Sequence, residues 1–415
     1  MSANLPTSHL FQGRSKADSP THSHLDASTR RSLLSHSAMK ILDRYLLRQF
    51  VQVFLICFLS MMGLYVVIDA FQHLDQFSSH AKESGNLFAV ISEYYAYRSL
   101  SFFDRTSGIL AMIAALFTAT WLQRHQELTA MLAAGITKFR VIKPLLAAAI
   151  AVSLLGVANR ELVIPRIRNE LMRDVNDLAG NETRDLEARF DGQTDILIGG
   201  EKTVTVEERI LKPTFVLPAS LARYGKQLVA ENGYYQTATA EHPAGYLLDR
   251  VTSPAKIDQL ASLKLEDRTV IVTARDANWL EPGQAFVVSQ LPFQMLASGS
   301  AWRNYASTGE LITELSNPST DLGADVRVAV HSRLMQPVVD VTLLMLGLPL
   351  MFSRRNRNVF LSIGMCLLVA ISFSLVTLAC QSLGGLNLLR PTLAAWLPIM
   401  LFLPVAVGMS HTLRT

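Results

Sequence analysis

Ionised side chains are scarce in this chain of 415 residues. Only 17% of the residues are Asp, Glu, Lys or Arg, whereas a soluble domain usually carries about 25%. Half of the residues are hydrophobic, and the mean hydropathy is +0.26. A bundle made only of membrane helices would carry still fewer charges. The composition therefore predicts a chain that is partly membrane-embedded and partly water-soluble, and it argues against intrinsic disorder.

Cysteine is almost absent, and its few positions exclude two further classes. Cys57, Cys366 and Cys380 all lie in apolar runs and form no CxxC pair. They are typical of small buried hydrophobic residues, so we expect neither a disulfide framework nor a cysteine metal site. The ten histidines show no ligand spacing. The sequence therefore predicts no bound metal.

Motifs for catalysis and nucleotide binding are also missing. The chain contains no GxxxxGK[ST] loop, so it should not bind ATP through a P-loop. It also contains neither the HExxH motif of zinc proteases nor the GxSxG motif of serine hydrolases. The net charge is +4, and its basic residues are too scattered for a nucleic-acid-binding surface. We expect a protein that is not an enzyme and that needs no cofactor.

Long hydrophobic runs are what the sequence does contain. A membrane-spanning helix needs about 20 mostly apolar residues, and six runs approach or reach that length: Phe50–Ile68, about 99–122, 145–164, 334–352, about 359–381 and about 392–408. The first contains no ionised group. We predict a membrane α-helical bundle of six spans, grouped three and three. The predicted domains are a disordered cytoplasmic tail (1–39), spans one to three (40–165), an insert (166–330) and spans four to six (331–415).

Basic residues in the short loops predict the orientation of these spans. They gather before span one, between spans two and three, and between spans four and five, which are all on the same side of the membrane. The opposite loops carry fewer. The chain therefore should have both termini in the cytoplasm and its insert outside. The basic residues on the cytoplasmic side are Lys40, Arg44, Arg48, Arg124, Lys138, Arg140, Lys143, Arg354, Arg355 and Arg357.

The insert reads as a β domain. After a charged, helix-permissive start, short alternating or β-branched segments such as RTVIVTARDANWL recur. Turn signals separate them, among them Gly199-Gly200, Asn232-Gly233 and Pro282-Gly283. Many short strands with regular turns indicate a sandwich or barrel. We predict an inserted all-β domain of the jellyroll type.

The second cytoplasmic loop, QRHQELTAMLAAGITKFRVIKP, predicts a short amphipathic helix at about 125–137. Glu127 lies in its first turn, where a carboxylate suits the helix dipole, and Gly135 can end it. The pattern fits a helix in the lipid headgroup zone or one that docks into a groove of a cytoplasmic partner, and by itself slightly favours the first. Its apolar stripe is Leu128, Met131, Leu132, Gly135 and Ile136.

Four stretches together resemble the lipopolysaccharide export permeases LptF and LptG, also called the YjgP/YjgQ family. They are ILDRYLLRQF with the following DAFQHLDQF, the loop segment QELTAMLAAGI, HSRLMQPVVDVTLLMLGLPLMFSRRNR, and LGGLNLLRPTLAAWLPIMLF. Each is weak alone. Their order around a β insert is more specific, and the resemblance covers about residues 39–412.

This resemblance implies a function and a set of partners. The chain would be a permease subunit in the bacterial inner membrane, paired with a second LptF/LptG-type permease. An LptB-type cytoplasmic ATPase would supply ATP hydrolysis, and an LptC/LptA-type periplasmic bridge would receive the lipopolysaccharide. Glu127 would contact the ATPase, and Leu128, Met131, Leu132 and Gly135 would meet its groove. Spans one and five line the lateral gate in the family.

Cations near the outer membrane boundary are the predicted contacts for the lipid. Lipid A carries phosphates, which arginine binds with a well-matched geometry. The candidates are Lys82, Arg98, Arg105 and Arg160. Because Asp104 adjoins Arg105 and Glu161 adjoins Arg160, local ion pairs could neutralise these two arginines.

Asp340 is unexpected, because it lies well inside span four. An intramembrane carboxylate suggests function, and we expect it to face the interior and to meet a cation such as Arg333 or one from another span. Two other functions remain open from the sequence. One is a membrane-anchored β-domain scaffold or receptor, and the other is an ion-coupled lipid transporter with Asp340 as its proton site.

Overall fold

A computed structural model describes residues 27–84, 86–173, 183–205, 207–239, 242–265, 268–299, 301–351 and 359–411. The side chains of residues 27–40, which include the predicted basic residue Lys40, and of Lys82 are outside this description, and so are residues 1–26 of the predicted tail and the predicted basic residues Arg354, Arg355 and Arg357. The chain divides into two units, residues 1–45 and 46–415. The architecture below is that of the second unit.

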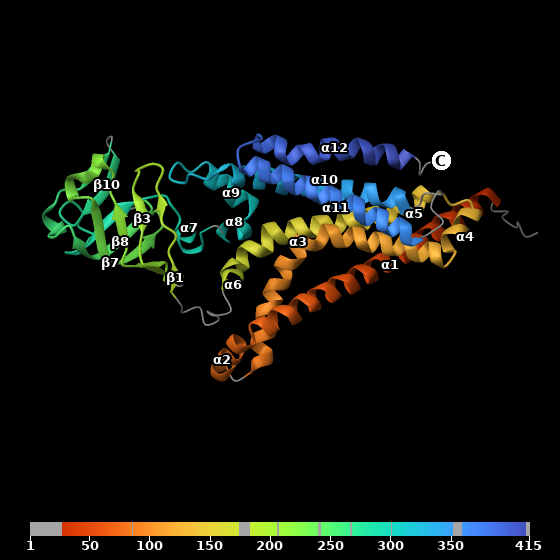
Figure 1. The fold of residues 1–415 in the computed structure, drawn as a ribbon, viewed down its shortest axis with the longest axis horizontal. Helices are drawn as coiled ribbons and strands as arrows, with labels where there is room; N and C mark the ends of the chain where they lie inside the picture. The colour runs from red at the N-terminus through yellow and green to blue at the C-terminus, as the bar shows by residue number, and fades with distance from the viewer. Residues whose placement is uncertain are drawn as a thin grey trace, which may run out of the picture. The chain divides into compact units, whose positions relative to one another are not determined.

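The described residues contain six helices that are long and apolar enough to cross a membrane, which confirms the predicted bundle. In Figure 1 they run from α1 to α12, with the insert between α6 and α10. Span three is composite, because α5 continues through a π turn (η1), a 3-10 turn (η2) and α6. The bounds are α1 Ala27–Gln72, α3 Leu87–Arg124, α5 Lys138–Ala158, η1 Asn159–Val163, η2 Ile164–Ile167, α6 Arg168–Met172, α10 Ala324–Met351, α11 Val359–Gly385 and α12 Pro391–His411.

Three of these helices form the centre of the bundle. Between 39% and 44% of the apolar stretch is buried in α3, α5 and α10, against 11% in α1 and 22% in α11. Small side chains allow the close approach, because Ala114 and Ala115 of α3 are fully buried and Gly347 of α10 lies against Leu116. The first and fifth spans therefore lie at the edges of the bundle, with large apolar side chains exposed.

Aromatic side chains hold α1 to α3. Phe54 meets Phe103 edge to face, with ring centroids 6.4 Å apart. Further along, α2 (Leu74–Ser84) folds back, and Phe77 is fully buried between the two helices. The hydroxyl of Tyr95 donates a hydrogen bond of 2.7 Å to Asp69 of α1. This contact ties the ends of the first two spans together on the side of the β insert.

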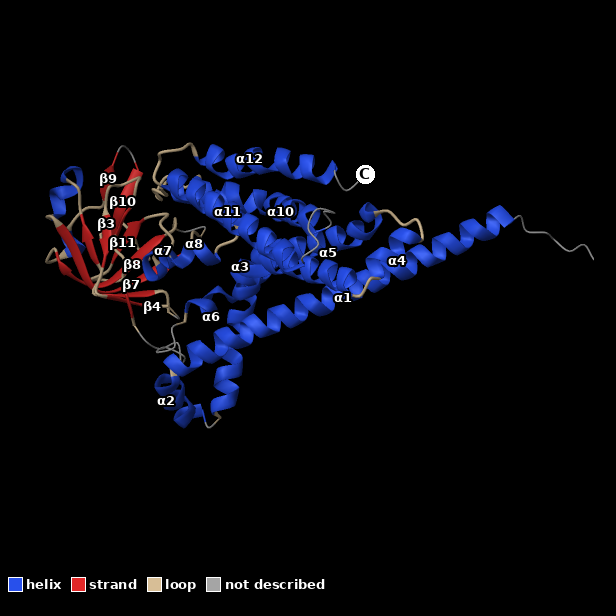
Figure 2. Ribbon diagram, turned by 45° about the vertical axis from the view of Figure 1, so that its right-hand side comes forward, coloured by secondary structure: helices blue, strands red, loops and turns tan. Residues whose placement is uncertain are grey.

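The insert contains an antiparallel sheet of eleven strands among the described residues, drawn in red in Figure 2. Its main path is β1-β4-β5-β7-β8-β11-β10-β9, with β2, β3 and β6 beside it. The inserted β domain is thus confirmed. The strands are β1 Arg184–Asp185, β2 Arg189–Phe190, β3 Leu197–Gly199, β4 Lys202–Val204, β5 Arg209–Leu211, β6 Thr214–Val216, β7 Gln227–Gln236, β8 Gly245–Ser253, β9 Leu263–Leu265, β10 Arg268–Thr273 and β11 Ala285–Val288.

Three short helices follow the last strand, which the strand pattern did not predict. They are α7 (Phe293–Ser298), α8 (Ala301–Tyr305) and α9 (Thr308–Leu315). Ser307 and Glu310 form a capping box at the start of α9. Phe293, Trp302 and Leu311 of these helices are buried in the same core as the strands. They therefore complete the domain and lead the chain back to α10.

Candidate functional site

A cavity of about 420 Å³ lies among α3, span three, α10 and α11. Its wall is mixed: Phe373 and Leu378 of α11 and Leu343 of α10 are apolar, whereas all four elements also contribute polar groups. Such a mixed wall inside an apolar bundle is costly unless the polar groups are satisfied or serve a ligand. The polar lining residues used below are Asp104, Arg105, Ser153, Arg160, Gln336 and Asp340.

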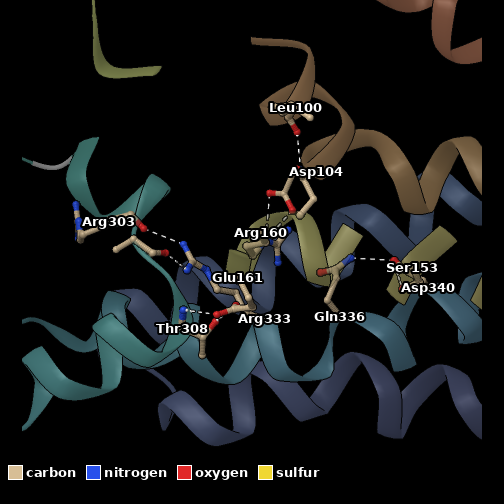
Figure 3. Close-up of polar contacts among 12 residues, drawn as sticks. Leu100, Asp104, Ser153, Arg160, Glu161, Arg303, Thr308, Arg333, Gln336 and Asp340 are labelled. Atoms are coloured by element: carbon tan, nitrogen blue, oxygen red, sulfur yellow. Dashed lines mark hydrogen bonds and ion pairs between the residues drawn. The ribbon is translucent and has the colours of Figure 1, made fainter. Parts of the chain in front are cut away.

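Asp340 is the centre of a hydrogen-bond network in this wall (Figure 3). The Ser153 hydroxyl donates to Asp340 Oδ2 over 2.6 Å, and Gln336 Nε2 donates to Asp340 Oδ1 over 2.9 Å. Gly108 of α3 makes room for the carboxylate, because a Cβ at that position would overlap with it. Three helices therefore meet around one carboxylate.

The sequence offered Arg333, or a cation from another span, as the neighbour of Asp340, and Arg333 does not pair with it. Arg333 donates instead to the backbone carbonyls of Arg303 and Ala306, at 2.8 and 2.6 Å. The cations that line the cavity together with Asp340 are Arg105 of α3 and Arg160 of span three, both from other spans. The physical reason is that Arg333 lies almost two helical turns before Asp340, where its side chain reaches α8 and the turn after it.

Asp104 and Arg160 pair with each other across two spans. Arg160 Nε donates to the two carboxylate oxygens of Asp104 over 2.8 and 3.1 Å. Next to this pair, Asn159 Nδ2 donates to the carbonyl of Leu100 over 2.8 Å. The local pairs that the sequence suggested do not form. Arg160 is therefore largely neutralised, whereas Arg105 has no ion pair among the described residues.

Arg105 lies where two further hollows meet the main cavity. One hollow, of about 390 Å³, is lined by Arg105, Arg160 and Arg333 together with Asn304 and other polar side chains. Arg105 is exposed, so its guanidinium remains available to a ligand. A positive rim thus surrounds the end of the cavity that is nearest to the insert.

The other hollow, of about 130 Å³, contains the predicted lipid contact Arg98. Arg105, Tyr65 and Tyr305 also line it. The Arg98 guanidinium lies 4.6 Å from the centre of the Tyr94 ring, and its Nε has no hydrogen-bond partner among the described residues. Arg98 and Arg105 are thus brought together, whereas Lys82 belongs to α2 and its side chain lies outside the described residues.

The predicted amphipathic helix is present as α4, Glu127–Ala133, between α3 and α5. Glu127 lies in its first turn. Leu128 is buried within the chain, so it is not free to enter a partner's groove. Met131 is half-buried, and Leu132 is exposed by 37%. The surface that α4 presents outward is therefore formed by Leu132 and the small residues beside it.

The end of α4 is a Schellman motif. The Gly135 amide donates to the carbonyl of Leu132, and the Ile136 amide donates to the carbonyl of Met131, both over 3.0 Å. Gly135 has a φ of +83°, which side chains with a Cβ rarely adopt. The glycine stops the helix one turn before α5 begins, which confirms the predicted end.

A comparison with protein families agrees with this architecture. The family described as lipopolysaccharide export system permease LptF/LptG matches residues 44–411. The chain belongs to this family. No curated protein matches the chain. An LptF/LptG permease is a transport subunit and not itself an enzyme. Together with this family, the six candidate spans support a multi-pass protein of the inner membrane.

Two features of the site were missed from the sequence. Gln336 and Ser153 bind the carboxylate of Asp340, and Glu161 binds α9 (below). Gln336 could have been found, because it lies four residues before Asp340 on the same helix face. Ser153 and Glu161 could not, because the spans on which they lie had no assigned neighbours in the sequence.

Proposed function

We propose that this LptF/LptG permease is the membrane subunit of an ATP-driven lipopolysaccharide exporter. It extracts the lipid from the inner membrane and passes it to an LptC/LptA-type periplasmic bridge. It acts with a second LptF/LptG-type permease and with an LptB-type ATPase, which hydrolyses the ATP. In this orientation both termini and α4 face the cytoplasm, and the β domain faces the periplasm.

The observation that carries this proposal is the cavity of about 420 Å³ with polar and apolar walls. Lipopolysaccharide combines acyl chains with phosphates, so it needs apolar surface and cations at one site. Phe373 and Leu378 supply apolar wall. Arg105, which has no ion pair within the described part of the chain, supplies a cation at the end nearest to the insert, where the phosphates of an outer-leaflet lipid would lie.

Arg105 and Arg98 are the cations we assign to lipid phosphate. They line the same small hollow, so a phosphate there would meet two guanidinium groups. Arg160 contributes less, because Asp104 already occupies its Nε. Lys82 remains a candidate contact at the membrane surface.

The lipid assignment is tested by delivery assays in proteoliposomes that contain the assembled exporter. Arg105→Gln should lower lipid delivery about tenfold, because a charge-assisted bond to phosphate is lost. Arg166→Gln is the control, because Arg166 is an exposed arginine of the neighbouring 3-10 turn that lines none of these hollows. Equal losses in the two variants would contradict a specific phosphate contact at Arg105.

The ATPase assignment is tested at α4. Leu132→Asp should abolish co-purification of the ATPase, because the exposed apolar contact becomes a charge. Glu127→Arg should weaken it by reversing the charge at the start of the helix. Ile312→Asp is the matched control, since Ile312 is an exposed aliphatic side chain of α9, 51% exposed, in the insert. Retention of the ATPase by Leu132→Asp would refute the docking role of α4.

Asp340 is the observation that favours a second candidate function, ion-coupled lipid transport, because it is a carboxylate that lines a cavity within the bundle. An ion-coupled transporter would move lipid in response to a pH gradient without ATP. Proteoliposomes with an imposed pH gradient and no nucleotide decide between the two. Delivery under those conditions that is lost in Asp340→Asn would favour ion coupling over the ATP-driven exporter.

A further inference from the structure

The π turn η1, at the end of span three, holds two charged side chains that reach different parts of the molecule. Arg160 binds Asp104 in the wall of the cavity. Glu161, the next residue, binds the start of α9: its Oε2 accepts the Thr308 amide over 2.8 Å, and its Oε1 accepts the Thr308 hydroxyl over 2.5 Å. Figure 3 shows both contacts. Adjacent residues therefore join the cavity wall to the insert.

Glu161 is not needed as an ordinary helix cap. α9 already has a complete capping box, in which Ser307 and Glu310 bind each other's backbone amides. Glu161 adds a carboxylate from another helix to the same end, where the helix dipole favours negative charge. The contact therefore serves to connect span three with α9.

Two more contacts hold the same region of the insert. Arg168 of α6 binds Glu310 of α9 over 3.1 Å. Arg333 of α10 binds the carbonyls of Arg303 and Ala306, at α8 and just after it. The segment from α8 to α9 is thus fixed from span three and from span four. We call it the joint, defined as residues 303–310 with Glu161, Arg168 and Arg333.

Span three also starts at the opposite end of the bundle beside α4. Gly135 ends α4, and α5 begins at Lys138. One continuous helical segment, α5 with η1, therefore runs from the helix assigned to the ATPase to the joint. This segment therefore connects, within one span, the end of the bundle beside α4 with the joint.

We propose that Glu161 is a positioning residue that couples movement of span three to the β domain through Thr308. This inference rests on the proposed function, and it adds the path by which ATP hydrolysis at one end of the bundle moves the lipid-accepting domain at the other. The joint acts as a rigid connection. Breaking it leaves ATP hydrolysis intact and uncouples hydrolysis from lipid delivery.

The test measures ATP hydrolysis and lipid delivery separately in proteoliposomes that hold the full complex. Glu161→Ala should lower the lipid delivered per ATP at least about tenfold, because the loss of even one of the two bonds to the carboxylate corresponds to that factor, while the hydrolysis rate stays within about twofold. Thr308→Val should give a smaller loss, because the amide remains, and Thr308→Ser should retain parent behaviour, because both donors remain.

Glu170→Gln is the matched control. Glu170 is a carboxylate of α6 whose ion pair among the described residues is with Arg173, three residues away, so its loss should leave the delivery ratio unchanged. An equal ratio for Glu161→Ala and the parent would overturn the inference while leaving the exporter assignment intact. If the parent complex itself delivers no lipid with ATP, the proposed function fails instead.

A crosslinking experiment tests the joint without relying on the correct folding of Glu161→Ala. In a chain whose native cysteines are replaced by alanine, Glu161→Cys and Thr308→Cys together are joined by a short bismaleimide. Delivery per ATP should be low before crosslinking and should recover after it, because the covalent bridge restores the connection. Failure of the crosslinked complex to deliver lipid would mean that the joint must open, which contradicts a rigid connection.

Discussion

At the scale of single residues, the cost of placing polar groups inside the bundle explains their arrangement. Asp340 is bound by a hydroxyl from span three and by an amide from its own helix. Asp104 and Arg160 satisfy each other. A buried polar group without a partner costs more than its hydrogen bond contributes. The network therefore fixes how α3, α5 and α10 align around the cavity.

Substitutions at Asp340 should separate hydrogen bonding from charge. Asp340→Leu leaves the Ser153 hydroxyl and the Gln336 amide without this acceptor, which costs about 1–3 kcal/mol for each group. Asp340→Asn keeps one acceptor oxygen and should cost clearly less. Thermal unfolding of the purified protein in detergent measures both. If Asp340→Leu unfolds at the parent temperature, the network does not stabilise the bundle.

Gly108 should tolerate no larger side chain. In Gly108→Ala the new Cβ would overlap with the Asp340 carboxylate, and we expect a loss of about 1–3 kcal/mol from overpacking. Gly63→Ala in α1 is the control, because no atom lies within 4 Å of a Cβ there. Gly108→Ala should unfold below the temperature of the parent. Gly63→Ala should unfold above it, because alanine favours a helix more than glycine does.

Glu314 should make the stability of the insert pH-dependent. Burial raises the pKa of Glu314, the nearby Glu310 also raises it, and a hydrogen bond from Asn317 partly offsets both. A raised pKa means that the folded state binds the proton more tightly than the unfolded state. Stability therefore falls as the pH rises from 4.5 through the folded pKa.

Glu314→Gln should thus unfold at a higher temperature than the parent at pH 7, and the difference should disappear at pH 4. Thermal unfolding at both pH values is the measurement. Glu281→Gln is the control, because Glu281 is an exposed carboxylate of the same domain. A stabilisation that is equal at pH 4 and pH 7 would contradict the role of ionisation.

At the scale of elements, α4 shows how a short helix is defined by its ends. It has seven residues, which is too few for stability on its own. The Schellman motif and the burial of Leu128 hold it in place. Its outer surface can then be presented to a partner in a fixed orientation.

Gly135 should be required for this orientation. Gly135→Ala forces a side chain into a φ of +83°, at a cost of about 1–2 kcal/mol, and should weaken ATPase binding about tenfold. Gly135→Asn should retain more affinity, because asparagine adopts positive φ more readily. Titration of the ATPase against the detergent-solubilised permease measures the effect. Equal affinities for the alanine and asparagine variants would argue against backbone strain.

At the scale of the whole molecule, the exposed faces of α1 and α11 indicate where a second permease would bind. Leu367, Leu368 and Leu375 of α11 are each more than half exposed. The resemblance to this family implies that the first and fifth spans line a lateral gate. We expect the two permeases to meet along these edges and to complete the cavity between them.

Co-expression should therefore yield a one-to-one complex of the two permeases that unfolds several degrees above either chain alone. Leu375→Trp should weaken the complex, because it enlarges the side chain at the edge of α11. Val405→Trp is the control, at an exposed aliphatic position of α12. The measurements are the mass of the complex in detergent and its unfolding temperature. Two permeases that purify separately would contradict the pairing.

The sequence alone determined the features that depend on local pattern. Apolar run length predicted the six spans, and alternation with turn residues predicted the β domain. The apolar stripe before Gly135 predicted α4 and its end. Each of these follows from the chemistry of a short window, because a helix must bury or embed its apolar surface wherever it lies.

The tertiary structure decided which of these residues act together. Asp104 pairs with Arg160, 56 positions away, and not with its neighbour Arg105. Glu161 reaches Thr308 across 147 positions, and Leu128 is buried where the stripe alone suggested a free surface. Sequence periodicity gives each helix a face but not the neighbour that the face meets. Packing of α3, α5 and α10 determines those neighbours, and with them the cavity, the position of Arg105 and the joint.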